Sequence, residues 1–214
     1  MNAHALSTLA VALFLAPSPS APRPEPPALR GVVVDETGAP LEGARCWISG
    51  FEERDGDGWR LVHRTGLPRV AFTGADGAFE LEAPAGLRCD VDFDADGRAP
   101  AFVRAVEPGE PLRVALAVGR TVSGSVVLRD GDREEPVPHA KVALERSSAR
   151  GLWFEHAVLA DEHGRFELPG KLPEAPDDET WSLVFGGARL ALDPGDAGEL
   201  HDVRIEVRMA RGGD

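Results

Sequence analysis

The sequence predicts an all-β protein built from two tandem β-sandwich domains. Two observations lead to this fold class. Apolar and polar residues alternate in short runs such as 112–118 and 203–209, which is typical of strands with one face on a core and one in water. In addition, one pattern of turn and core residues occurs twice, and such a repeat indicates a scaffold made of similar units.

The repeated pattern consists of a hairpin segment and, farther along, a tight turn. The first copy has its hairpin at 31–46 and its turn at 76–81. The second copy has them at 124–142 and 163–168. Gly and Pro residues separate the alternating runs, as they do in sandwiches of short strands.

The two copies place the domains at residues 30–118 and 119–214, with almost no linker between them. We therefore expect the domains to be closely coupled. The second copy has three additional residues around 130–132, and the first copy has nine in its middle, within 51–68. Both insertions fall at polar Gly/Asp turns, which is where surface loops tolerate changes in length.

The N-terminal segment is interpreted as a leader followed by a tether. Residues 1–21 contain no Asp, Glu, Lys or Arg, and their apolar run followed by small residues resembles a secretory signal peptide. The run is shorter than the roughly 20 apolar residues that a membrane-spanning helix needs. Residues 22–29 are rich in proline and are expected to form an extended linker. The alternative is an apolar, disordered N-terminus.

The formal net charge of −13 limits the classes of partner. Such a field repels nucleic acid and anionic lipid, and no basic stripe offsets it. We predict a secreted, periplasmic or cell-envelope protein without a membrane span after signal cleavage. Its partner would be an unidentified protein or glycan at the cell envelope.

Both cysteines lie in the first copy and are predicted to face its core. Cys46 is two residues from Ala44 and from Ile48, and Cys89 is two residues from Val91. In a strand, residues two apart point to the same face, so both cysteines share a face with apolar residues. In an exported domain this arrangement suggests a Cys46–Cys89 disulfide, which would stabilise the fold by about 4 kcal/mol. The alternative is two buried thiols that pack as small apolar groups.

The first copy carries a recognisable motif. Residues 31–46 read Gly-x-Val-x-Asp-x-x-Gly-x-Pro-Leu-x-Gly-Ala-x-Cys, and residues 76–81 read Asp-Gly-x-Phe-Glu-Leu. This pattern resembles the carboxypeptidase regulatory-like domain, here in two tandem copies, of which the second is diverged and has His139 where the motif has glycine. The resemblance implies seven-stranded, transthyretin-like (Ig-like) β-sandwiches. It also implies an accessory, non-catalytic module of exported bacterial proteins.

A search for catalytic or metal-binding patterns yields one weak candidate. No zinc-peptidase spacing and no Gly-x-Ser-x-Gly elbow is present, so we predict no enzyme and no catalytic residues. Asp92, Asp94 and Asp96, followed by Gly97, match the opening of a calcium loop. The position of the final glutamate is Val103, however, so we predict no cofactor and little dependence on calcium. We expect Asp90 and Asp92 to lie on the outward, solvated face of the strand that carries Cys89, and 94–97 to form the turn after it.

Two tryptophans are weak candidates for ligand binding. Trp47 alternates with core-facing residues and should point away from the core, and Trp59 lies in the enlarged segment of the first copy. Exposed together, they would favour binding of a carbohydrate or peptide. More often such tryptophans cover an outer sheet face or the domain junction. The leading functional hypothesis is a structural or interaction module; a ligand-binding module is second, and an accessory domain of a peptidase system is third.

Overall fold

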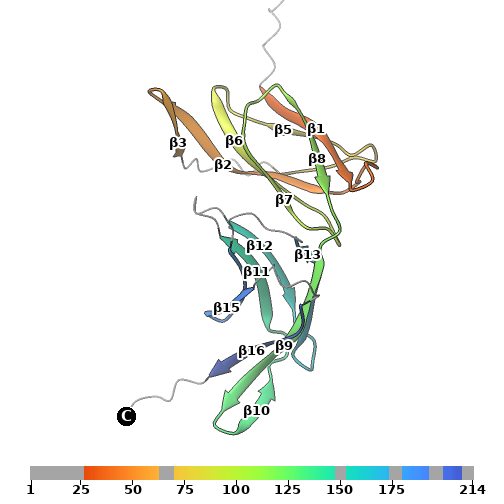
Figure 1. The fold of residues 1–214 in the computed structure, drawn as a ribbon, viewed down its shortest axis with the longest axis vertical. Helices are drawn as coiled ribbons and strands as arrows, with labels where there is room; N and C mark the ends of the chain where they lie inside the picture. Colours follow the sequence, from red (N-terminus) through yellow and green to blue (C-terminus); the bar gives the residue numbers. More distant parts are fainter. Residues whose placement is uncertain (1–26, 63–69, 148–152, 174–179, 193–199, 209–214) are drawn as a thin grey trace, which may run out of the picture.

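The computed structural model describes residues 27–62, 70–147, 153–173, 180–192 and 200–208. These ranges contain strands and turns and no helix, which confirms the predicted all-β class. Accordingly, no helix in them is long and apolar enough to cross a membrane. The predicted signal peptide at 1–21 lies outside the described residues. The molecule is elongated, and its two halves follow one another along the long axis (Figure 1).

The first half consists of two sheets. One sheet has the order β5-β1-β8, and the other has the order β3-β2-β6-β7, with β4 also pairing with β2. The strands are β1 (Ala28–Asp35), β2 (Arg45–Asp55), β3 (Gly58–Val62), β4 (Val70–Phe72), β5 (Ala78–Glu82), β6 (Leu87–Asp94), β7 (Ala101–Val106) and β8 (Pro111–Leu116).

The second half also has two sheets. One has the order β10-β9-β13, with β16 also pairing with β9, and the other has the order β12-β11-β14-β15. The strands are β9 (Arg120–Asp130), β10 (Arg133–Pro136), β11 (Lys141–Ser147), β12 (Trp153–Leu159), β13 (Arg165–Leu172), β14 (Thr180–Phe185), β15 (Ala188–Leu192) and β16 (Leu200–Arg208).

The two halves share one pairing scheme. β1 pairs antiparallel with β5 and parallel with β8, and β9 pairs antiparallel with β13 and parallel with β16. In the other sheets, the pairing of β2 with β6 and β6 with β7 matches that of β11 with β14 and β14 with β15. The repeat in the sequence is therefore also a repeat in strand topology.

The strand count differs from the seven per domain that the family resemblance implied. Within the described ranges each half has eight strands. The first half uses its enlarged segment for the hairpin of β2 and β3. The second half uses its insertion around 130–132 for the hairpin of β9 and β10. The insertions therefore extend strands into hairpins.

The first strand begins earlier than the sequence indicated. β1 starts at Ala28, inside the segment 22–29 that was assigned to a linker. Leu29 is fully buried and Arg30 is exposed, so strand alternation already operates here. The linker prediction is wrong for residues 28 and 29, because one core-facing leucine is enough to include this stretch in the sheet.

The turn glycines of the repeat are required by close packing of backbone. Gly77 has a φ of +73°, and a Cβ placed on it would lie 2.4 Å from the Val33 carbonyl oxygen. Gly164 also has a φ of +73°, and its Cβ would lie 2.7 Å from the Val126 carbonyl oxygen. A side chain at either position would clash and would strain the backbone. This explains why glycine recurs in both turns.

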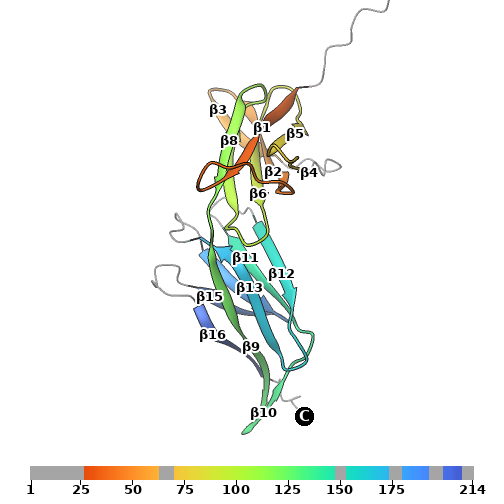
Figure 2. The same cartoon turned by 90° about the vertical axis from the view of Figure 1, so that its right-hand side faces the viewer.

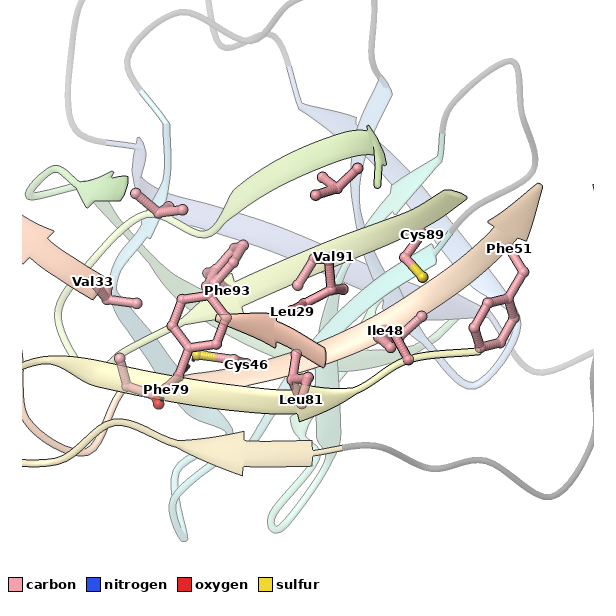
Figure 3. Close-up of a cluster of buried hydrophobic side chains, with 14 of the residues drawn as sticks. Leu29, Val33, Cys46, Ile48, Phe51, Phe79, Leu81, Cys89, Val91 and Phe93 are labelled. Carbon is pink, nitrogen blue, oxygen red and sulfur yellow. Dashed lines mark hydrogen bonds between the residues drawn. The ribbon is translucent and has the colours of Figure 1, made fainter. Parts of the chain in front are cut away.

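The core of the first half contains both cysteines, but they do not form a disulfide (Figure 3). Cys46 lies opposite Phe93 in the β2–β6 pair, and Cys89 lies opposite Phe51. Four residues on β6 therefore separate the two positions, about 13 Å along the strand. A disulfide needs Cα atoms within about 7 Å.

The predicted Cys46–Cys89 bond is thus wrong, and the alternative of two buried thiols describes the structure. Alternation correctly placed both side chains on the core face. It could not give the register between β2 and β6, which decides whether the sulfurs meet. Burial raises the pKa of the Cys46 thiol to about 12, so this group stays protonated at neutral pH.

Candidate functional site at the junction of the two halves

The outer face of the sheet β2-β6-β7 meets the end of the second sandwich. Trp47 and Phe102, both from the first half, pack against the buried apolar cluster of the second half. The Phe102 ring centroid lies 6.4 Å from that of Trp181, and the Arg146 guanidinium lies 3.5 Å from the Phe102 centroid. Side chains of the first half therefore close the end of the second core. Figures 1 and 2 show the first half stacked on this end of the second half.

We call this region the joint. It comprises Trp47, Asp90, Asp92, Asp94, Phe102 and Arg104 of the first half with Arg146, His156, Lys171 and Trp181 of the second half. Charged groups dominate the list, although most of them are buried or nearly so. Buried charges need partners, because leaving water costs each ion several kcal/mol.

Two carboxylates on β6 are fully buried in the joint. Asp92 Oδ1 accepts hydrogen bonds from Ser49 Oγ at 2.9 Å and from Arg104 Nη1 at 2.8 Å. Burial raises the pKa of Asp92, and the contacts with Arg104 and Ser49 oppose that rise. Asp90 Oδ1 accepts a hydrogen bond from the Ala105 backbone N–H at 3.0 Å.

A β-bulge makes the Asp90 contact possible. Cys89 pairs with Val106, and Val91 pairs with Val103. Two residues of β7 therefore lie opposite the single residue Asp90. Ala105 lies in this bulge with a φ of +55°, in the left-handed region that alanine rarely adopts. The bulge turns the Ala105 N–H toward the buried carboxylate. The backbone of β7 is therefore shaped around Asp90.

A buried lysine connects the halves directly. Lys171 is 1% exposed, and its Nζ donates to Asp94 Oδ1 at 2.7 Å and to the Ala95 carbonyl oxygen at 2.5 Å. His156 Nδ1 lies 3.8 Å from Asp94 Oδ2. Burial alone would raise the pKa of Asp94, but His156 and Lys171 outweigh it and hold that pKa below its ordinary value.

Arg146 supplies a further buried cation. Burial, together with the nearby positive charge of Arg104, lowers the pKa of Arg146 to about 10, while Asp92 and Asp90 act in the opposite direction. Arg146 thus remains charged at neutral pH. The joint balances cations of the second half against carboxylates of the first half.

Three glycines bring the two backbones into contact. Gly170 has a φ of +63°, and a Cβ on it would lie 2.3 Å from the Gly97 carbonyl oxygen. A Cβ on Gly119 would lie 2.4 Å from the Gly170 carbonyl oxygen. No side chain fits at either position. Gly77 and Gly164 are equivalent positions of the two copies, and the same offset makes Ala83 the first-half equivalent of Gly170. Because the first half has alanine at this position, the sandwich fold itself does not require glycine at position 170.

The aspartates proposed as a calcium loop have another use in the structure. Oxygens of Asp92 and Asp94 contact Ser49, Arg104, Lys171 and His156, as given above. Asp96 is exposed in the following turn. Among the residues with described positions, no group of three or more His, Cys, Asp or Glu side chains could hold a metal ion. The weak metal assignment is therefore replaced by an ion-pair joint.

Sequence reasoning expected the β6 aspartates to face water, and it did not find the joint. The alternation was interpreted correctly for their direction, since they point away from the first core. The structure covers them with the second half. One signal was available in the sequence: Lys171 stands among apolar residues at the end of β13 and is fully buried there. A lysine in such a place needs an acidic partner.

Trp47 and Trp59 do not form a common cleft. Trp47 lies at the joint, with the Arg45 guanidinium 4.6 Å from its ring centroid. Trp59 pairs with Arg54 near the other end of β2, seven residues or about 23 Å from Trp47. The Arg88 guanidinium lies 4.0 Å from the Trp59 centroid, beside a cavity of about 240 Å³. The candidate pair is therefore divided between the joint and the far end of the first half.

Comparisons with known proteins give a limited result. No protein-family model matches the chain, and no curated protein matches it. Similar solved structures include a Streptococcal ancillary pilin, with 14% identity, 85% of this chain and 62% of that chain covered, and a TM-score of 0.36. A minor pilin of Streptococcus agalactiae has 13% identity, coverages of 85% and 94%, and a TM-score of 0.35.

The Bacillus anthracis TIE protein is also similar, with 17% identity, 86% of this chain and 33% of that chain covered, and a TM-score of 0.29. These identities and TM-scores are too low to carry an argument about function. The carboxypeptidase regulatory-like resemblance likewise stays a prediction. The function must be argued from the residues themselves.

Proposed function

We propose that the chain is an exported, non-catalytic structural module in which two sandwich domains, 30–118 and 119–214, act as one stiff unit. The observation that carries this proposal is the joint. A buried Lys171–Asp94 pair and Phe102, which closes the second core, fix the two halves against each other. Domains of one chain are expected to move relative to each other unless their interface is large and hydrophobic. In this chain the apolar contacts of Trp47 and Phe102 are supplemented by buried ion pairs and close backbone contacts.

The joint opposes bending in three ways. Displacing the halves would separate the Lys171 ammonium from Asp94 and leave both charges incompletely paired. It would also withdraw Phe102 from Arg146 and Trp181. Finally, the close contact of Gly97, Gly119 and Gly170 leaves little space for another arrangement. A stiff unit of this kind would hold whatever is attached to its ends at a fixed separation.

A distance measurement between the halves tests the stiffness. Spin labels at Asp57 and Asp132, both exposed in turns, report on the first and second half respectively. We expect a single narrow distance distribution in the wild-type chain and a broad one in Lys171→Met. Arg30→Ala, which removes an exposed ion pair far from the joint, is the matched control and should keep the narrow distribution. A broad wild-type distribution would show that the unit is not stiff.

Export and envelope location are proposed from the leader-like residues 1–21 and from the resemblance described above. Fractionation of cells expressing the full chain, followed by N-terminal sequencing, tests this. We expect a mature chain lacking residues 1–21 outside the cytoplasm. An uncleaved chain in the cytosol would contradict it.

A further inference from the structure

A polar groove of about 650 Å³ lies on the outer face of the sheet that contains β13, β9 and β16. Figure 2 shows these three strands side by side in the second half. Its polar lining residues are Ser123, Ser125, Arg165, Glu167, Asp202 and Arg204. The groove is separate from the joint.

The strand register arranges these residues in two rows. Ser125 on β9 lies opposite Arg165 on one side and opposite Arg204 on the other. Ser123 lies opposite Glu167. Strands are about 4.8 Å apart and residues two positions apart are about 7 Å apart, so the rows span an area of about 10 by 7 Å. That area matches one or two sugar rings in size.

The first half explains why the groove exists. At the position of Ser123 it has Arg30, which lies opposite Glu80 and donates to it at 3.0 Å. The arginine side chain covers this part of the first sheet. In the second half serine replaces arginine, and Glu167 has no cationic partner among the residues that the structure describes. The shorter side chain opens the groove and leaves a carboxylate facing it.

The edge of the groove has an irregular backbone. β16 shifts register between Leu200 and Val203, and Asp202 lies in this bulge with a φ of +58°. Next to it, His201 Nδ1 lies 3.1 Å from Ser123 Oγ. Bulges and left-handed non-glycine residues are enriched at functional sites, where they direct side chains toward a ligand. Both features occur here beside the serine that opens the groove.

We propose that this groove binds a neutral saccharide, a role beyond that of the structural module. Its lining combines the carboxylates of Glu167 and Asp202 with the guanidinium groups of Arg165 and Arg204. Arg204 already pairs with Glu134 and Glu206, so the groove has no surplus positive charge for an anion, and the chain as a whole repels anions. Sugar hydroxyls can donate to Glu167 and Asp202 and accept from Arg165 and the serine hydroxyls. Phe166, the aromatic residue in the described lining, is buried in the core and is not available for stacking. We expect weak binding, with a Kd of about 1 mM.

Nuclear magnetic resonance titration of the full chain tests the proposal. The probes are cellotetraose, maltotetraose and the tetramer of N-acetylglucosamine, each up to about 10 mM, which is well above the expected Kd. We expect saturable shifts of amide signals in β9, β13 and β16 with at least one of them. Ser123→Arg restores in the second half the arginine–glutamate pair of the first half. It should weaken binding tenfold or more while the melting temperature stays unchanged.

Two further variants separate binding from folding. Glu167→Gln retains the shape of the groove and should also weaken binding, which decides the case if Ser123→Arg fails to fold. Arg30→Ser makes the reverse change in the first half and should leave binding unchanged. Absence of saturable shifts with every saccharide would overturn the proposal, as would shifts centred on the Trp59 cavity. Shifts of the same amides by an extended alanine-based peptide, but by no saccharide, would assign the groove to peptides instead.

Discussion

The two halves have the same strand pairing, yet the outer faces of their equivalent sheets differ. In the first half Trp47 on β2 lies opposite Asp92 on β6. In the second half the corresponding pair is Ala143 and Val184 on β11 and β14. Residues common to both halves, such as the turn glycines, serve folding. Residues that differ form the contribution of the first half to the joint and, on the second half, the groove. We therefore expect function to lie in the differences.

The comparison also reveals a dependence between the halves. The second core is closed by Phe102 and Trp47, which come from the first half. The buried cluster of the first half and the partly buried residues packed against it all come from that half. The first half should therefore tolerate disruption of the joint better than the second. The following predictions test this dependence, from the largest expected effect to the smallest.

Lys171→Met should have the largest effect. It leaves the Asp94 carboxylate, only 15% exposed, without its ammonium partner, which should lower the free energy of unfolding by about 3–5 kcal/mol. Urea denaturation measures this loss. The double variant Asp94→Asn with Lys171→Met should recover much of it, because no uncompensated charge remains. A loss below about 1 kcal/mol in the single variant would mean that the pair does not hold the joint.

Phe102→Ala should separate the melting of the two halves. Removing a half-buried ring from Trp181 and Arg146 should cost about 2 kcal/mol, below the usual range for a fully buried phenylalanine. Calorimetry should show the second half unfolding at a lower temperature than the first. Arg189 is the second-half equivalent of Phe102, because it lies opposite Val184 as Phe102 lies opposite Asp92. The control variant Arg189→Ala should therefore leave a single transition. Two transitions already present in the wild type would contradict the proposed coupling.

Gly170→Ala should destabilise the protein by about 1–2 kcal/mol through its positive φ alone, with the contact to Gly97 adding to this. The reverse change at the corresponding first-half position, Ala83→Gly, removes no joint contact and should leave the spin-label distance distribution narrow. Thermal unfolding and the distance measurement check both variants. An unaffected Gly170→Ala variant would show that the backbones can move apart without cost.

Acid should weaken the joint through Asp94. Its pKa is lowered in the folded chain, so the unfolded chain binds its proton more tightly. The stabilisation is complete above the ordinary aspartate pKa of about 4 and is lost as the pH falls through the lower folded value. Urea midpoints at neutral and acid pH should therefore differ less in Asp94→Asn than in the wild type. Equal differences would exclude this role of Asp94.

Reductant should have no effect on stability, because the cysteines are not bonded. Without reductant, both thiols should be alkylated after denaturation, as measured by mass spectrometry. In the folded chain Cys46 should react very slowly at neutral pH, since it is fully buried and its pKa is about 12. A drop in melting temperature on adding reductant would restore the disulfide hypothesis.

Several elements could be predicted from the sequence because they depend on local patterns. Alternation placed Cys46, Cys89 and Trp47 on the correct faces of their strands. The repeated pattern located the tight turns at 76–81 and 163–168, where Gly77 and Gly164 have positive φ. The insertions were located in the two segments that form additional hairpins. Each of these features follows from a few neighbouring residues and from the geometry of a strand or turn.

The joint and the groove could not be predicted in the same way. The carboxylates of Asp90 and Asp92 were expected in water because a strand's outer face is usually solvated. Ser123 alone does not indicate a groove. The difference becomes visible only when the two sheets are compared, because Ser123 lies opposite Glu167 where Arg30 lies opposite Glu80. Lys171 and Asp94 are 77 residues apart, and no local pattern connects them.

By itself, the sequence determined the all-β class, the two copies and the direction of most side chains, because the alternation of a strand is a local property. Only the tertiary structure decided which sulfurs stay apart, which sheet face is covered and which lysine meets which aspartate. The physical reason is that register between strands and contact between halves depend on how distant segments pack. Alternation in one strand restricts the face of a residue, and it leaves the neighbour across that face undetermined.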